Sequence, residues 1–527
     1  MENKEYIIGI DVGSSKVVMA VGTRNDNGEI SVIGVDVEPI EDCVKDGDIM
    51  NYIGLGAAIG KAKAALESEL QIRLNSAYIG ISGRSVYCVR YEDYVEINER
   101  TGYVTESELR ELNARIEMVV SGGGDEIIDR IPLRYTIDDN RSVSNPLGAF
   151  GRKLSATYLF VLAGKHQIDR INRALYQTDI KVCGLCVNPT LLPELLLSPD
   201  EMETGVAIVD IGSDLTDISI VREGKLWHFA SLPIGASSIN NDLFEFLKIS
   251  KKDVDGLKRR WGSAMASMVD ENTTVPVKMA GHAKKQILQR NIAEIAEERL
   301  KDIANFVLRE LKGSKFISKI PCGVVLTGGS AYLSNIDELF AKELNMEVRL
   351  GMALNGLDYE SQEKVTSFSQ SVAVGLLLYG AKHNACEIVP ATPKRETETE
   401  IRKSVWEEQP QQNIDIFTPV EEIETVVSQP QPHPQPEPEE ELPPIHEDEP
   451  IRDEEVEEPK DEEVDNQIDE KSDEQEDVQN DDNDKKDDDK NDDNKDNGNG
   501  GQNGGRRNWW GKIIDWVDNS FVSDKYI

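Results

Sequence analysis

The sequence lacks the features of several common protein classes. No apolar run reaches the roughly 18 to 20 residues that a membrane-spanning helix needs. Only six cysteines occur among 527 residues, and the chain does not start with the basic and then apolar segments of a secretion signal. Basic tracts are also missing from the body of the chain, so nucleic acid is not expected as a partner, because phosphate neutralisation supplies most of that affinity. We therefore expect a cytoplasmic, reduced protein that meets any membrane only from its surface.

Negative charge is concentrated near the C-terminal end. The whole sequence has 58 basic and 98 acidic side chains, a net charge of −40. Residues 391–505 supply 11 basic and 40 acidic side chains, or −29, whereas residues 1–390 supply 43 and 55, or −12. The acidic segment contains too few apolar residues to offset the entropy lost on ordering. We predict a globular body over residues 1–390 and a disordered acidic linker over residues 391–505.

Apolar side chains return in residues 506–527. Placed on a helix at 100° per residue, they share one side, and the polar side chains share the other. Such a stripe usually packs on its own domain, but this one follows a linker and combines three Trp residues with basic residues near its start. The pattern predicts an interfacial membrane helix whose apolar face consists of Trp509, Trp510, Ile513, Ile514, Trp516, Val517 and Phe521.

The body contains an internal repeat. Apolar, strand-like runs cover residues 6–12, 17–22 and 30–37, and a helical pattern covers residues 59–70. The segment AIVDIGSDLTDISIV has the form of IIGIDVGSSKVVMAV, with the two Asp residues, Asp210 and Asp11, 199 positions apart. A repeat on this scale implies a duplicated core of mixed α/β class.

The repeated turns predict a phosphate site. Short Gly/Ser turns expose backbone N–H groups to phosphate oxygens, and Ser14, Ser15 and Lys16 add donors and one positive charge. Asp11 and Asp210 are placed to hold waters of a Mg²⁺ shell. The glycine of a single such turn could be required by the hairpin alone. Two copies of the turn favour a ligand that both of them bind.

A third glycine-rich turn follows a later apolar strand. Residues 323–330 end in Thr-Gly-Gly-Ser, which lets the backbone approach a flat ligand at the end of the strand. Taken alone, this is an ordinary strand-to-helix turn.

These motifs together resemble those of a known superfamily. The order GIDVGSSK, IVDIGSDLTDI, GVVLTGGSA and SVAVGLLLYG resembles the phosphate loops, adenosine loop and second connecting helix of the actin, Hsp70 and sugar-kinase superfamily. Within it, the chain resembles the FtsA family of bacterial cell-division proteins. That closer resemblance depends on a small α/β module at residues 84–162, on NPLGAFGRKLSATYLFV and NIAEIAEERLKDI, and on the terminal amphipathic helix.

The resemblance implies an actin-like duplicated α/β fold with a two-lobed nucleotide cleft and an inserted subdomain of the type called 1C. The implied first lobe comprises residues 1–83, 163–198 and 366–390, with the insert at 84–162. The implied second lobe comprises residues 199–245 and 320–365, with a 2B-like subdomain at 246–319.

The resemblance also implies a site for ATP and Mg²⁺. Its first phosphate loop would be Gly13, Ser14, Ser15 and Lys16, its second Asp210, Gly212 and Ser213, its adenosine border Gly328, Gly329 and Ser330, and its ribose and base neighbours Asp255 and Lys258. Asp255 is shorter than the Glu of the family. Asp214 replaces a Gly of the second loop, and its carboxylate would repel a terminal phosphate, so we expect at most slow ATP hydrolysis.

The function implied is that of a polymerising scaffold at the division site. Such a protein would anchor the FtsZ ring to the cytoplasmic face of the inner membrane as a peripheral protein and recruit later division proteins through residues 84–162. Two alternatives stay open: an enzyme of the superfamily, either a small-molecule kinase or a chaperone-type ATPase, and an actin-like adaptor of a pilus or secretion machine.

Cys183 and Cys186 have redox or zinc spacing, but their segment is predicted to be a strand. The six His residues show no ligand spacing.

Overall fold

The computed structural model describes residues 5–278, 284–353, 355–365, 367–383 and 388–390. The predicted linker and the predicted terminal helix, including its seven apolar contact residues, lie outside this part of the chain. No helix within it is long and apolar enough to cross a bilayer.

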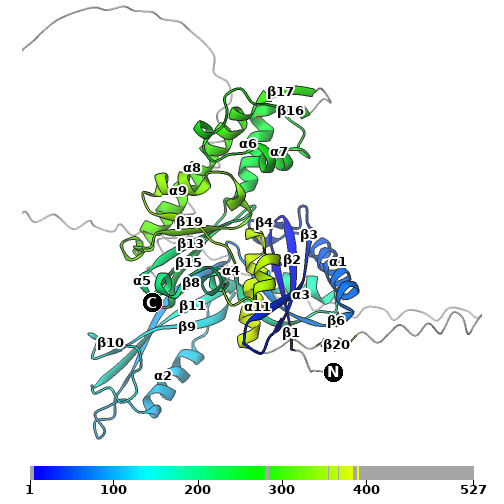
Figure 1. The fold of residues 1–527 in the computed structure, drawn as a ribbon. Coiled ribbons are helices and arrows are strands. Elements are labelled where there is room, and N and C mark those ends of the chain that lie inside the picture. The colour runs from blue at the N-terminus through cyan, green and yellow to red at the C-terminus, as the bar shows by residue number, and fades with distance from the viewer. Residues whose placement is uncertain (1–4, 279–283, 354, 366, 384–387, 391–527) are drawn as a thin grey trace, which may run out of the picture. The chain divides into compact units, whose positions relative to one another are not determined.

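A five-stranded sheet forms the first half of the body (Figure 1). The central strand pairs antiparallel on one side and parallel on the other, and its apolar run is buried, as is typical of strands covered on both faces. The predicted first strand has the bounds observed, and the next two strands are each longer than predicted. In spatial order the strands are β12 (Lys181–Val187), β7 (Ser76–Ile81), β1 (Tyr6–Val12), β2 (Lys16–Arg24) and β3 (Ile30–Pro39).

A second five-stranded sheet repeats the first. Its first three strands form an antiparallel meander, and the other two join in parallel, in the same spatial order as before. The predicted duplication is therefore confirmed at the level of topology. The strands are β15 (Lys225–Leu232), β14 (Thr216–Arg222), β13 (Val206–Ile211), β18 (Val324–Thr327) and β19 (Val348–Leu350).

Helices cover these sheets. α1 (Tyr52–Leu70) starts seven residues before the predicted helix, because Asn51 caps it and its early glycines allow close packing: a Cβ at Gly56 would lie 2.8 Å from Ala174 O. α11 (Ser371–Lys382) crosses β1 closely enough that a Cβ at Gly9 would lie 2.7 Å from Ala373 O. The other helices around the sheets are α3 (Lys165–Tyr176), α4 (Asn188–Leu196), α5 (Pro199–Thr204), α9 (Ile336–Leu344) and α10 (Tyr359–Lys364).

A separate four-stranded sheet occupies most of the interval between β7 and α3. Its helix, α2 (Glu106–Met118), begins with a capping box at Thr105 and Glu108 and buries Leu112 and Ile116 in a small core. In spatial order the strands are β10 (Arg141–Val143), β9 (Asp125–Ile137), β11 (Lys153–Gly164) and β8 (Val86–Glu96).

A mainly helical insertion separates β15 from β18. It contains α6 (Ala236–Leu247), α7 (Val254–Trp261), α8 (Gln289–Gly313) and the hairpin β16 (Thr274–Lys278) with β17 (Lys284–Leu288). The remaining short elements are β4 (Val44–Lys45), β5 (Asp48–Ile49), β6 (Ile72–Leu74), β20 (Ile388–Pro390) and the 3₁₀ turns η1 (Ala266–Met268), η2 (Ile317–Lys319), η3 (Gly329–Tyr332) and η4 (Phe368–Gln370).

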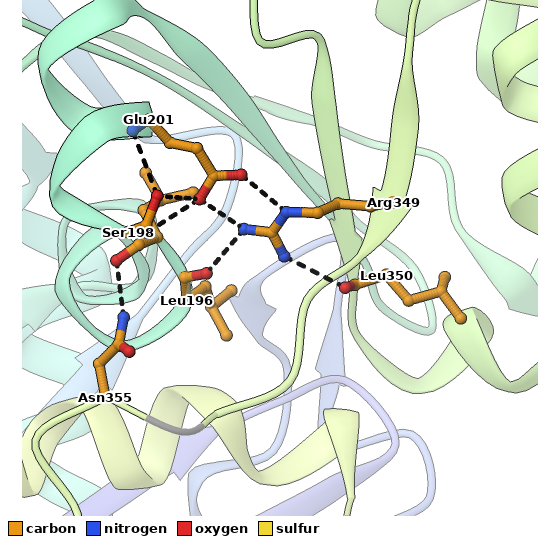
Figure 2. A network of polar contacts seen from close by, with 7 residues as sticks. Leu196, Ser198, Glu201, Arg349, Leu350 and Asn355 are labelled. Carbon is orange, nitrogen blue, oxygen red and sulfur yellow. Dashed lines mark hydrogen bonds and ion pairs between the residues drawn. The ribbon is translucent and has the colours of Figure 1, made fainter.

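A polar network joins β19 to the end of α4 and to α5 (Figure 2). The Arg349 guanidinium donates from Nε to Glu201 Oε1 (2.7 Å) and from Nη2 to Glu201 Oε2 (2.8 Å), so the pair is bidentate. Arg349 Nη2 also donates to Leu196 O (3.0 Å), and Ser198 caps α5 against Glu201. The hydrogen bonds from Arg349 hold the pKa of the Glu201 carboxyl at about 2.

Candidate functional site

The two repeated turns have the same backbone geometry. Gly13 N donates to Lys16 O (3.1 Å) in the turn between β1 and β2, and Gly212 N donates to Leu215 O (2.9 Å) in the turn between β13 and β14. Ser14 and Ser15 lie within the first turn, and Ser213 lies within the second. The same backbone hydrogen bond therefore closes each turn at the same point of the repeat.

Acidic side chains precede both turns. Burial raises the pKa of Asp11 to about 7, against the opposing influence of Lys16 and a hydrogen bond from Asn188. The pKa of Asp210 is raised to about 8, first by burial and then by the charges of Asp217 and Asp11, whereas Lys16 lowers it. The structure thus brings Asp11, Lys16 and Asp210 close enough for their charges to interact, although 199 positions separate the two turns in the sequence.

Asp217 is a member of this cluster that the sequence analysis did not identify. It lies on β14 directly opposite Asp210, and burial raises its pKa to about 6. Ser82 Oγ donates to Asp217 Oδ1 (2.6 Å) and lies 2.9 Å from Ser231 Oγ. A signal was present in the repeat, because the first copy has Val18 at the equivalent position. A carboxylate in an otherwise apolar strand is a polar group that needs a partner.

The third glycine-rich turn adjoins the second sheet at the cluster. Thr327 ends β18 beside Asp210, and Gly328 has φ 88°. A Cβ at Gly328 would lie 2.1 Å from Asp210 Oδ1, so only glycine fits this backbone. At Gly329 a Cβ would meet only Ser369 Cβ, at 3.9 Å, so this position has room for a ligand or a side chain. The sequence predicted a helix directly after this turn, but a 3₁₀ turn intervenes and α9 begins at Ile336.

The second turn is held by the start of α6. Ala236 N donates to Gly212 O (3.0 Å), and Ser237 N donates to Ser213 O (2.8 Å). A Cβ at Gly235 would lie 2.4 Å from Ser213 O, so the helix approaches the turn more closely than other residues would permit. The loop over residues 212–215 is therefore anchored to the start of α6 by two backbone hydrogen bonds.

Asp255 and Lys258 lie one helical turn apart on α7. Asp255 Oδ1 accepts from Lys258 Nζ (3.2 Å), and Asp255 Oδ2 accepts from Arg259 Nε (2.7 Å). Burial raises the pKa of Asp255, but Lys258 and a hydrogen bond from Asn240 outweigh it, so the net shift is downward. Burial lowers the pKa of Lys258, which also donates to Ala236 O (3.3 Å) and so reaches the element that holds the second turn.

Several buried polar atoms near these residues are unpaired. Within the described part of the chain, Asn188 Oδ1, Asn240 Oδ1 and Ser330 Oγ have no hydrogen-bond partner. Ser330 is only 4% exposed, and Asn188 donates its other amide end to Asp11 Oδ1 (3.3 Å). A buried unpaired polar group costs about 1 to 3 kcal/mol, so each of these three atoms is a candidate contact for a polar ligand.

The acidic cluster has the chemistry for a cation held through water. Asp11 and Asp210 both interact electrostatically with Lys16, Asp217 lies opposite Asp210, and burial raises the pKa of all three carboxyl groups. No group of three or more His, Cys, Asp or Glu side chains among the described residues lies close enough together to bind a metal directly. Mg²⁺ usually keeps several waters, which suits carboxylates that do not converge.

Asp214 faces a second acidic group. Burial is the main cause of the raised pKa of Asp46, and the charge of Asp214 raises that pKa as well. Arg84, whose Nη2 lies 2.6 Å from Asp46 Oδ2, opposes the shift. Ser213 Oγ donates to Asp214 Oδ1 (3.3 Å).

The Cys183–Cys186 segment is strand β12, as predicted, with Cys183 exposed and Cys186 buried. His228 is bonded to Glu310 Oε1 (2.8 Å) away from these turns, which agrees with a structural role.

Two like sheets with paired turns, acidic residues before each turn and a small α/β insertion define an actin-like protein. A family model of the cell division protein FtsA matches residues 207–375, and a model of the SHS2 domain inserted in FtsA matches residues 83–162. The chain is therefore similar to the FtsA family of cell-division proteins over both of these regions.

Curated relatives agree with this assignment. The cell division protein FtsA of Pseudomonas aeruginosa is 29% identical over 388 residues, which cover 72% of this chain and 90% of that protein. The cell division protein FtsA of Bacillus subtilis is 26% identical over 351 residues, which cover 66% and 79%. Among solved structures, a PilM–PilN type IV pilus biogenesis complex matches with a TM-score of 0.50 at 14% identity, over 71% of this chain and 98% of that one. This last likeness shows a shared fold only.

Proposed function

We propose that this protein binds ATP with Mg²⁺ between its two repeated turns, assembles into filaments and anchors the FtsZ ring to the cytoplasmic face of the inner membrane. A role in cell division follows from the family. The observation that carries the nucleotide proposal is the electrostatic contact between Lys16 and both acidic residues, Asp11 and Asp210, across the two halves of the repeat.

The proposed division of labour assigns each ligand group to residues of this chain. Backbone N–H groups within the two turns, other than those of Gly13 and Gly212 that close them, would hold the phosphates together with Lys16. Asp11 and Asp210 would hold waters of Mg²⁺, and the bound cation would supply positive charge that the cluster lacks. The room at Gly329 suits a flat base, and the unpaired Ser330 Oγ supplies a polar contact beside it.

A glycine substitution tests the nucleotide proposal. Gly329→Leu should fold normally, because the position has room, and should abolish ATP binding, because the side chain would occupy the proposed adenosine border. Gly60→Leu, on α1, is the matched control, because a Cβ at Gly60 meets only Thr178 Cγ2, at 3.8 Å. Titration with a fluorescent ATP analogue and Mg²⁺ measures both variants. Unchanged affinity in Gly329→Leu would show that the adenosine border lies elsewhere.

A truncation tests the membrane proposal. The sequence of residues 508–527 has the pattern of an interfacial helix with three Trp residues. Deleting these residues should leave ATP binding unchanged and should release the protein from vesicles containing anionic lipid in a flotation assay. Continued flotation of the truncated chain would contradict the proposed anchor. The number of apolar residues in the helix favours only reversible attachment per subunit, so binding should also strengthen when filaments form.

The proposed partners are FtsZ and, through residues 84–162, later division proteins. The described body supports this division of roles because the inserted module has a core of its own around α2, separate from the nucleotide site. Co-sedimentation with FtsZ polymers, with and without ATP, tests the first partner. Hydrolysis should be slow, since Asp214 replaces a glycine next to the proposed terminal phosphate. Rapid turnover without self-association would instead favour an enzyme of the superfamily.

A further inference from the structure

The carboxylate expected to contact ribose is already occupied by protein donors. Asp255 Oδ1 accepts from Lys258 Nζ (3.2 Å) and from Asn240 Nδ2 (3.2 Å), and Asp255 Oδ2 accepts from Arg259 Nε (2.7 Å). These three donors, two of them charged, lower the pKa of Asp255 despite its burial. A ligand hydroxyl that sought this carboxylate would have to compete with charge-assisted hydrogen bonds.

Asn240, in contrast, is only half satisfied. Its amide nitrogen is committed to Asp255, while its Oδ1 is shielded from water and has no hydrogen-bond partner among the residues that the structure describes. An amide oxygen is an acceptor with two lone pairs. Because an unpaired buried acceptor is costly, the natural reading is that a ligand donates to it.

The position of Asn240 restricts which part of a nucleotide can reach it. Asn240 follows Ala236 by four residues on α6, so the two share one face of the helix, and Ala236 N is bonded to Gly212 O of the second turn. A phosphate cannot satisfy Asn240 Oδ1, because its ionised oxygens only accept. The group that follows the phosphates in a nucleotide is the ribose, whose hydroxyls can donate. One helical turn, about 5 Å, is a suitable offset between the two.

We infer that Asn240 is a specificity-determining residue that accepts a hydrogen bond from a ribose hydroxyl of the bound nucleotide, with Asp255 acting to orient its amide. This inference depends on the proposed nucleotide site. It assigns the ligand to the ribonucleotides, as distinct from deoxyribonucleotides, and it places ribose recognition on α6 instead of α7.

The test compares ATP, 2′-deoxy-ATP and 3′-deoxy-ATP, each titrated with Mg²⁺ into the full-length chain. The wild-type protein should bind at least one deoxy analogue about tenfold more weakly than ATP, since one well-made hydrogen bond corresponds to about a factor of ten. In Asn240→Leu, which keeps the size of the side chain and removes the acceptor, ATP should bind as weakly as that analogue. The analogue itself should bind both proteins within about twofold.

Asn241 provides the matched control. It is the same residue type on the same helix, it is exposed, and it points about 100° away from Asn240. Asn241→Leu should keep the full preference for ATP over the deoxy analogue. Asp255→Asn should keep that preference as well, although it loosens Lys258 and Arg259. Thermal unfolding of each variant checks that the fold is intact, and Asn240→Ser replaces Asn240→Leu if the latter does not fold.

The possible failures are distinguishable. Failure of the wild-type protein to bind any of the three nucleotides would overturn the proposed function itself. ATP binding with an undiminished preference in Asn240→Leu would overturn only the role of Asn240. Loss of the preference in Asp255→Asn, but not in Asn240→Leu, would return ribose recognition to Asp255. Equal binding of all three nucleotides by the wild-type protein would show that no ribose hydroxyl is recognised.

Discussion

Replacing Asp210 by Asn should stabilise the ligand-free protein at pH 8. Burial raises the pKa of Asp210 from 3.8 to about 8. Between about pH 4 and pH 8 the folded state therefore holds a proton that the unfolded state has lost, so the free energy of unfolding falls as pH rises through this window. Each unit of pKa shift corresponds to about 1.4 kcal/mol. After discounting for water that reaches a partly exposed carboxyl group, we expect a gain of about 2 kcal/mol from the neutral isostere at pH 8.

Urea unfolding of the full chain without nucleotide, at pH 5 and at pH 8, measures this effect. The wild-type protein should lose stability between the two values, and Asp210→Asn should lose less. Asp26→Asn removes one negative charge from an exposed turn and should show no pH-dependent gain. Addition of Mg²⁺ and ATP should stabilise the wild-type protein but not Asp210→Asn. An Asp210→Asn protein no more stable than wild type at pH 8, or equally stabilised at both values, would refute the reasoning.

Three further changes have defined outcomes. Glu201→Gln should lower the free energy of unfolding by about 1 kcal/mol in urea titrations, since it breaks a bidentate but partly exposed ion pair with Arg349. Arg349 lowers the pKa of Glu201 to about 2. The loss of stability should therefore be equal at pH 6 and pH 8 and should shrink only as the pH falls from about 4.5 towards 2. Gly328→Ala should cost about 2 to 3 kcal/mol by the same assay, from its φ of 88° and the contact with Asp210, whereas Gly122→Ala, which has open space, should cost less than about 1. Lys16→Met should weaken binding of a fluorescent ATP analogue by at least about tenfold, by removing a charge-assisted contact, and an unchanged affinity would exclude Lys16 from the site.

Much of the fold could be predicted from the sequence because apolar periodicity and turn residues are local signals. The strand Tyr6–Val12 has the predicted bounds, and the repeat around Asp11 and Asp210 predicted a duplicated core, which the structure shows as two sheets of equal topology. Errors arose where tertiary contacts override local preference. α1 starts at Tyr52, before the predicted helix, because the glycines in its first turns allow neighbouring residues to pack closely against the helix. The segment after Gly328 forms a 3₁₀ turn where a helix was predicted, since positive φ at that glycine redirects the chain.

Only those residues of the site that belong to a sequence motif could be predicted. Motif spacing identified Asp11, Lys16 and Asp210, whose charges interact in the structure. It could not identify Ser82, which lies 135 positions from its partner Asp217, because nothing local in the sequence marks a serine as the donor to a distant carboxylate. Pairings of this kind depend on how the two halves of the body come together, and only the structure contains that information.

The repeat is symmetric in geometry but not in charge, and this asymmetry makes the halves interdependent. The first turn has Lys16 where the second has Leu215, and the second copy has Asp217 where the first has Val18. The second half therefore carries two carboxyl groups at its turn and no cation at the position of Lys16. Part of its compensation comes from the first half, through the charge of Lys16 and the hydroxyl of Ser82. Because the second half does not balance its own charge, a ligand that supplies a cation between the turns would strengthen the contact between the halves as well as occupy the site.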